Sequence, residues 1–200
     1  MDTLFGIISY ALIGIGLAAS CGFRVFVPML VMSVAVRAGL LQLTEGWQWI
    51  GSWPALISFS VAAIAEVAGF YIPFVAHLLD ALATPAAVVA GTIATAACVA
   101  EMHPLVQWSA AIIAGGGIAA AVHAATATVR AGTTATTAGL ATWVVATLEL
   151  VTSLCLSVLA IAVPILAGLL ICVVGFFVVH WIIRRKGTVA QAGIPGEASH

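Results

Sequence analysis

Residues 18–30, Ala-Ala-Ser-Cys-Gly-Phe-Arg-Val-Phe-Val-Pro-Met-Leu, place an arginine and a proline inside an otherwise apolar helical pattern. No acidic residue lies within reach of Arg24 along the same helix. A charge at membrane depth costs about 2.5–3.5 kcal/mol on insertion scales unless it is paired or hydrated, so the rest of the chain must supply a partner for Arg24. Pro28 suits the first turn of a helix, which predicts a break at Ser20-Cys-Gly22 and a new helix after it.

The composition is that of an integral membrane protein. Hydrophobic residues make up 64% and charged residues 6% of the 200 residues, whereas a soluble domain carries about 25% charged residues. The apolar runs lack the alternation of barrel strands and are long enough for spanning helices. We therefore expect an all-α, polytopic membrane helix bundle. Its apolar runs are 3–41, 53–76, 81–100, 105–128 and 138–183.

Two topologies fit these runs. One has about six crossings with two interrupted or re-entrant segments, and the other has about seven plain crossings. The N-terminus is inside in the first topology and outside in the second. In either case residues 1–186 form a single transmembrane domain, and 187–200 are a flexible tail. Arg184-Arg185-Lys186 predict a cytoplasmic C-terminus by the positive-inside rule.

The two interrupted segments are 25–41 and 129–140. The second is too polar for lipid and too poor in charge for an open loop, so we expect a re-entrant segment that lines a cavity. Its threonines are Thr133, Thr134, Thr136 and Thr137. Elsewhere, Thr84-Pro85 predicts the start of a helix over 85–100.

A weak internal repeat relates residues 1–101 to residues 105–186. Ala18–Arg24 aligns with Ala124–Arg130, and each stretch leads to a span with a single glutamate, Glu66 or Glu149. If each half crosses three times, the halves have opposite orientations, the inverted-repeat plan of many transporters. The two arginines and two glutamates then pair across the repeat interface. The alternative is two ion pairs that only fix the register of the helices.

Four stretches carry a family resemblance: 16–28, 51–56 (Gly-Ser-Trp-Pro-Ala-Leu), 83–92 and 134–140. Together they resemble an uncharacterised family of bacterial multi-pass membrane proteins, domain of unknown function 4126, over residues 1 to about 180. The resemblance implies a protein of the bacterial cytoplasmic (inner) membrane. It carries over no substrate and no site residues.

We expect a small transporter or channel-like protein with a polar site at the membrane midplane. A small anion or an anionic headgroup would bind there, among Arg24, Glu66, Arg130, Thr133, Thr134, Thr136, Thr137 and Glu149. Helix N-termini pointing into the site would add positive potential. Membrane lipids are the expected surroundings, and a homodimer through the Gly/Ala faces is expected.

Two other functions stay open. One is a structural or accessory subunit that binds a partner membrane protein and needs no site. The other is a membrane-embedded lipid-modifying enzyme that uses a secondary polar cluster of His77 and Asp80, with Glu101 and His103 nearby. The four cysteines have neither disulfide-framework nor metal-ligand spacing. We expect no metal, no cofactor and no nucleic-acid partner.

Overall fold

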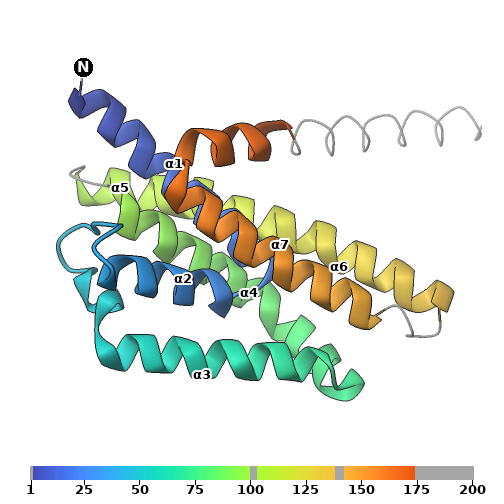
Figure 1. The fold of residues 1–200 in the computed structure, drawn as a ribbon. Coiled ribbons are helices and arrows are strands. Elements are labelled where there is room, and N and C mark those ends of the chain that lie inside the picture. Colours follow the sequence, from blue (N-terminus) through green and yellow to red (C-terminus); the bar gives the residue numbers. More distant parts are fainter. Residues whose placement is uncertain (1, 100–102, 138–141, 174–200) are drawn as a thin grey trace, which may run out of the picture. The chain divides into compact units, whose positions relative to one another are not determined.

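The structure is a computed structural model that describes residues 2–99, 103–137 and 142–173 of the chain. The chain divides into two compact units, Met1–Gly168 and Leu169–His200, and the helical bundle belongs to the first unit. Within the described ranges the chain is helical and contains no β-strand (Figure 1). The elements are α1 (Asp2–Phe23), α2 (Phe26–Arg37), η1 (Gln48–Gly51), α3 (Trp53–Phe70), α4 (Pro73–Cys98), α5 (Pro104–Ala110), the π-helical segment η2 (Ala111–Gly116), α6 (Gly117–Thr137) and α7 (Thr142–Ala162).

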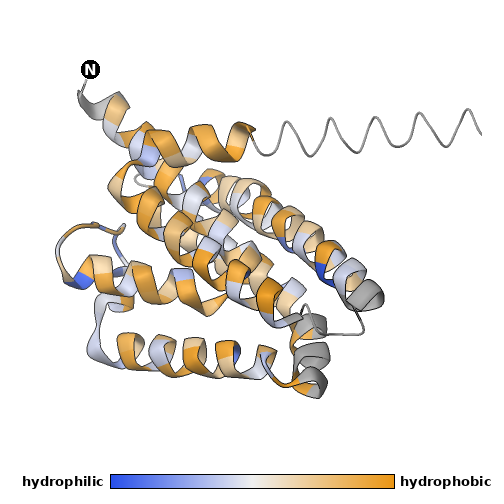
Figure 2. Ribbon diagram, turned by 45° about the vertical axis from the view of Figure 1, so that its right-hand side comes forward, coloured by the Kyte–Doolittle hydropathy of each residue, from blue (hydrophilic) through white to orange (hydrophobic). Residues whose placement is uncertain are grey.

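The helices have the length and surface of membrane spans. In the described part, four stretches are long and apolar enough to cross a membrane: Phe5–Phe23, Trp53–Phe70, Pro104–Thr133 and Trp143–Ala162. Hydrophobic residues predominate along the long helices of the described part (Figure 2), and large ones are exposed, such as Leu105 at 74% and Ile113 at 76%. Exposed apolar surface on this scale is unfavourable in water, so the chain is a membrane protein.

Two ends of the bundle can be defined from contacts. The loop end carries residues 38–52 and the end of α4, because Thr44 Oγ1 donates to the Ala97 carbonyl at 2.7 Å. The turn end carries Tyr71-Ile72 and the start of α7, because the hydroxyls of Tyr71 and Thr147 lie 3.1 Å apart.

Helices α1 and α2 form a hairpin that enters and leaves at the loop end (Figure 1). A methyl group on Gly14 would lie 3.3 Å from Cβ of Cys98, the last residue of α4, so α1 passes this level at Gly14. The return helix α2 has 12 residues, about 18 Å at 1.5 Å per residue. Its Ser33 hydroxyl donates to the Ile50 carbonyl of η1 at 2.6 Å. The hairpin tip therefore lies inside the bundle.

The predicted interruption of the first helix exists, but it falls at Arg24-Val25 instead of Ser20-Cys-Gly22. Pro28 explains the position, because its ring would clash with the carbonyl four residues earlier, which belongs to Arg24, and it has no N–H to donate there. Pro28 lies instead in the first turn of α2. The small residues before Arg24 serve close packing: a methyl group on Gly22 would lie 2.7 Å from the Ala119 carbonyl oxygen.

Two expectations about the later helices are wrong. Residues 129–137 belong to α6, which is helical through Thr137, so the second re-entrant segment is absent there, and 138–141 lie outside the described residues. The threonines are accommodated in the helix because their hydroxyls can bond backbone carbonyls of the preceding turn, as Thr133 Oγ1 does to Arg130 at 2.9 Å. Thr84-Pro85 does not start a helix, since α4 runs continuously from Pro73 with Pro85 inside it.

Candidate functional site: a buried charge cluster

Arg24 places its guanidinium inside the bundle near the turn end. The residue is 2% exposed, and its Nη2 donates to the Ala146 carbonyl of α7 at 3.0 Å. The same nitrogen lies 3.5 Å from Oε2 of Glu149. Cζ of Arg24 lies 3.9 Å from the ring centroid of Phe70, the last residue of α3. Among the described residues, Nε and Nη1 of Arg24 have no hydrogen-bond partner.

Arg130 of α6 meets the same carboxylate and the same ring. Its Nη2 donates to both oxygens of Glu149 at 2.7 Å, and its Cζ lies 4.7 Å from the centroid of Phe70. The Arg130 and Glu149 side chains are 7% and 6% exposed. One buried carboxylate thus faces two guanidinium groups, and one aromatic ring contacts both of them, as a cation–π partner does.

Glu66 has a different task. Its Oε1 accepts from the Val25 N–H at 2.8 Å and its Oε2 accepts from the Phe26 N–H at 3.0 Å. These donors stand at the start of α2, where backbone N–H groups have no partner within the helix and the helix dipole is positive. Glu66, which is 7% exposed, therefore caps the hairpin tip from α3. It is not an ion-pair partner of Arg24 at salt-bridge distance in the described structure.

Polar groups of neighbouring helices satisfy the end of α1. The Gly22 carbonyl contacts Nδ1 of His123 at 3.2 Å, and the Ser20 carbonyl accepts from Ser153 Oγ at 3.1 Å. Ser20 and Ser153 are fully buried. Because the last carbonyls of a helix need such partners away from water, helices α6 and α7 hold the tip in place.

The structure brings together the four charged residues that the sequence predicts. Their pairing differs from the expectation, since Glu149 serves both arginines and Glu66 caps a helix. The cluster also lies toward the turn end instead of the middle of the helices, because Phe70 ends α3 and Glu66 precedes it by one turn. Of the predicted threonines, Thr133 donates from Oγ1 to the Arg130 carbonyl at 2.9 Å. The side chains of Thr134, Thr136, Thr137, His77 and Asp80 lie outside the described residues.

The aligned residues occupy different places in their helices. Arg24 lies at a helix break, whereas Arg130 lies within α6. Glu66 lies one turn before the end of α3, whereas Glu149 lies two turns after the start of α7. The inverted repeat therefore stays a prediction.

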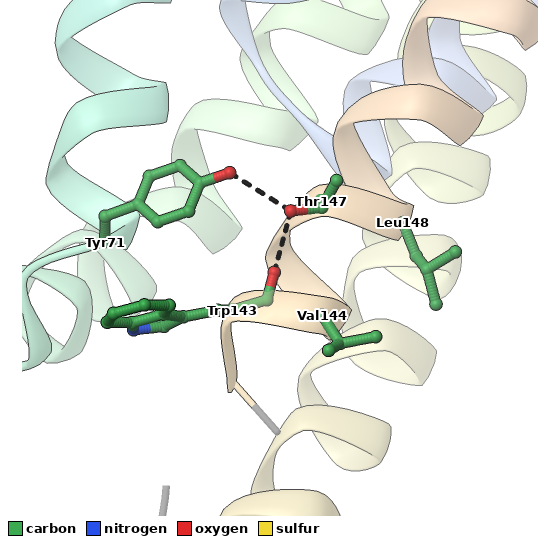
Figure 3. A pocket seen from close by; sticks show the side chains of 5 residues that line it. All are labelled: Tyr71, Trp143, Val144, Thr147 and Leu148. Carbon is green, nitrogen blue, oxygen red and sulfur yellow. Dashed lines mark hydrogen bonds between the residues drawn. The ribbon is translucent and has the colours of Figure 1, made fainter. Parts of the chain in front are cut away.

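Sequence reasoning missed Phe70 and a pocket beside it. The pocket has a volume of about 350 Å³ and is lined by Tyr71, Trp143, Val144, Thr147 and Leu148 (Figure 3). The hydrogen bond between Tyr71 and Thr147 spans the gap between α3 and α7. Two of the lining residues, Tyr71 and Thr147, follow Phe70 and Ala146 in the sequence. Phe70 and Ala146 are buried, and both contact Arg24 inside the bundle. The spacing of Glu66 and Phe70, four residues apart on one helix face, is the signal that could have found the ring.

The described residues contain no group of three or more His, Cys, Asp or Glu side chains placed to hold a metal ion. The fold and the cluster together define a helical membrane protein with a broken helix hairpin held on buried charges. The chain belongs to the family described as domain of unknown function DUF4126, whose model matches residues 11–185. No curated protein and no solved structure matches the chain.

Proposed function

We propose that the protein is a small transporter or channel-like protein for an anion, with the anion site at Arg24 and Arg130. The observation that carries the proposal is the unused donors of Arg24, whose Nε and Nη1 are buried and without hydrogen-bond partners among the described residues. A buried donor left unpaired costs about 1–3 kcal/mol, and more when it is charged. Intramembrane charges that the fold retains at such a cost generally mark a substrate or ion pathway.

The donors at this place favour an anion over a cation. Nε and Nη1 of Arg24 are buried and unused among the described residues, and both oxygens of Glu66 already accept from backbone N–H groups. The positive end of the α2 dipole points at the same region. A small anion or an anionic headgroup would complete this set of donors. The side chains that form the cluster are all less than a tenth exposed, as in the closed state of a transporter.

In this proposal the protein lies in a bacterial cytoplasmic membrane with its C-terminus in the cytoplasm. The test is anion flux into liposomes that contain the purified protein, with chloride, nitrate, acetate and phosphate as probes. We expect Arg24→Gln to lower the flux at least tenfold. Arg37→Gln is the matched control, because Arg37 is exposed and lies outside the cluster. Its Cζ lies 3.6 Å from the ring centroid of Trp53. A parent protein without flux for any probe, or a folded Arg24→Gln protein with full flux, would overturn the proposal.

A second candidate is a structural or accessory membrane subunit. Its support is that the cluster is sealed and ties the α1–α2 hairpin to α3, α6 and α7, which is also what a purely structural ion network does. This candidate predicts a stoichiometric partner that co-purifies from native membranes. It also predicts that Glu66→Gln and Glu149→Gln proteins, when folded, keep that partner.

A further inference from the structure

The backbone N–H groups at the start of α2 are occupied by a carboxylate that belongs to another helix. We propose that this N-terminus is the binding site for a planar oxyanion of the carboxylate or nitrate class, and that Glu66 is a tethered occupant which such an anion displaces. The inference rests on the proposed function and names the class of anion.

The geometry selects a planar anion with two adjacent oxygens. Val25 and Phe26 donate to different oxygens of the same carboxylate, at 2.8 Å and 3.0 Å. A formate, acetate, bicarbonate or nitrate ion presents the same pair of oxygens. Helix N-termini bind such anions because unpaired N–H groups and the positive end of the dipole coincide there.

Arg24 provides the second part of the site. It immediately precedes Val25, it is 2% exposed, and its Nε and Nη1 have no partner among the described residues. Its guanidinium stacks on Phe70, which follows Glu66 by one turn on the same face of α3. The ring against which the Arg24 guanidinium lies therefore belongs to the turn of α3 that follows Glu66. An anion that replaced Glu66 would meet the backbone N–H groups at the start of α2 and the donors of Arg24.

Small side chains flank Glu66 along its own helix, since residues 62–69 read Ala-Ala-Ile-Ala-Glu-Val-Ala-Gly. Helix α2 is short, and it starts inside the bundle. Without a cap, the N–H groups of Val25 and Phe26 would have neither a protein acceptor nor water as a hydrogen-bond partner. The site is therefore filled either by Glu66 or by an anion.

The test is chemical rescue of Glu66→Ala by added anions, followed as the melting temperature of the purified protein in detergent. We expect Glu66→Ala to melt below the parent, and formate, acetate or nitrate to raise its melting temperature saturably by several degrees. The salt control is gluconate at equal ionic strength, which is too large for the site. The variant control is Glu45→Ala, because Glu45 is an exposed glutamate and should show no rescue.

Glu66→Gln keeps the size of the side chain and provides the test if the alanine protein does not fold. One amide oxygen can satisfy only one of the two N–H groups, so we expect nitrate to half-saturate this variant at a concentration at least tenfold below that of the parent. Absence of saturable stabilisation by planar anions in the folded variant overturns the inference.

The two experiments test binding and transport separately, because anion rescue of the melting temperature measures binding and liposome flux measures transport. Rescue of Glu66→Ala without flux through the parent supports the site and contradicts transport. Flux that depends on Arg24, without rescue, contradicts the tethered occupant and leaves the transport proposal standing.

Discussion

Two guanidinium groups, one carboxylate and one aromatic ring meet within the bundle, and they come from four separate segments of the chain. Glu149 is the residue on which this arrangement depends, because both arginines direct Nη2 at its carboxylate. Phe70 covers both guanidinium groups and offers them the negative face of a ring in place of water. The arrangement keeps two like charges close together in a region poor in solvent.

We predict that Glu149→Gln destabilises the protein by about 3–5 kcal/mol, because removal of one partner leaves buried charge without compensation. The measurement is reversible unfolding in detergent micelles. Glu45→Gln removes the same charge at an exposed position and should change the stability by less than about 0.5 kcal/mol. Equal effects of the two substitutions would mean that the cluster contributes no more than a surface glutamate.

The sequence alone was enough to select Arg24, Glu66, Arg130 and Glu149, because charges are rare in apolar runs and must find each other. It could not assign their partners. Whether Glu66 meets a guanidinium or a helix start depends on where the first helix breaks, and a shift of the break from Cys21 to Val25 turns the new helix start toward α3. Phe70 went unnoticed because its one signal is its spacing of four residues from Glu66, and an aromatic residue in an apolar span draws attention only once that spacing is considered.

At the scale of elements, close backbone approach decides how helices pack. A methyl group on Gly91 would lie 2.8 Å from the Gly115 carbonyl oxygen, and one on Gly115 would lie 2.5 Å from that of Gly91. Helix α4 and the π segment η2 therefore touch through their backbones. Small residues permit such contacts, which add dispersion energy where the hydrophobic effect between helices is weak.

We predict that Gly115→Ala destabilises the protein by about 1–3 kcal/mol, the usual cost of overpacking. The new methyl group would clash with the Thr95 hydroxyl and with the backbone of α4. Gly117→Ala is the matched control two residues later, since a methyl group there meets nothing within 4 Å; it should be neutral or stabilising by up to about 1 kcal/mol. The measurement is the melting temperature of each variant in detergent. A Gly115→Ala protein that melts at the same temperature as the parent would contradict the packing argument.

The two wrong predictions about helix boundaries have local physical explanations. Proline at position 85 and the threonines after Arg130 carry signals for a helix start and for a break, but α4 and α6 continue through them. In a bundle poor in water, every backbone group that leaves a helix must find a new partner, so continuation is favoured even across Pro85 unless such a partner is at hand. At Arg24-Val25 the clash with Pro28 coincides with the Glu66 carboxylate, which accepts the freed N–H groups.

At the scale of the whole molecule, contacts between segments that are distant in sequence show which segments lie at the loop end and which lie at the turn end. Residues 38–52 lie beside the end of α4 and beside α5 at the loop end, where Thr44 bonds Ala97 and the ring centroids of Trp47 and Trp108 are 6.1 Å apart. The expected homodimer through glycine and alanine faces stays a prediction. Four of the glycines already pack closely against other helices of the same chain: Gly14, Gly16, Gly91 and Gly115. A second copy would have to use other surfaces.

We predict that single cysteines introduced as Glu45→Cys and His103→Cys react with a membrane-impermeant thiol reagent from the same side of sealed vesicles. Ile72→Cys, at the turn end, should react from the opposite side. The background is a protein with its four cysteines replaced, and all three positions are exposed. Labelling of positions 45 and 103 from opposite sides would contradict the described path of α3 and α4.

The π turn at Ala111–Gly116 has a consequence for natural sequence variation. It widens one turn of a continuous helical segment, and His123 and Arg130 follow it on the same segment. Closure of that turn into ordinary helix with no residue lost would rotate everything after it by about 100°, away from Gly22 and Glu149, because the wide turn accommodates one extra residue. Relatives with a functional cluster should therefore keep the number of residues between the π turn and the arginine, and a relative with ordinary helix here should lack one residue at the turn itself.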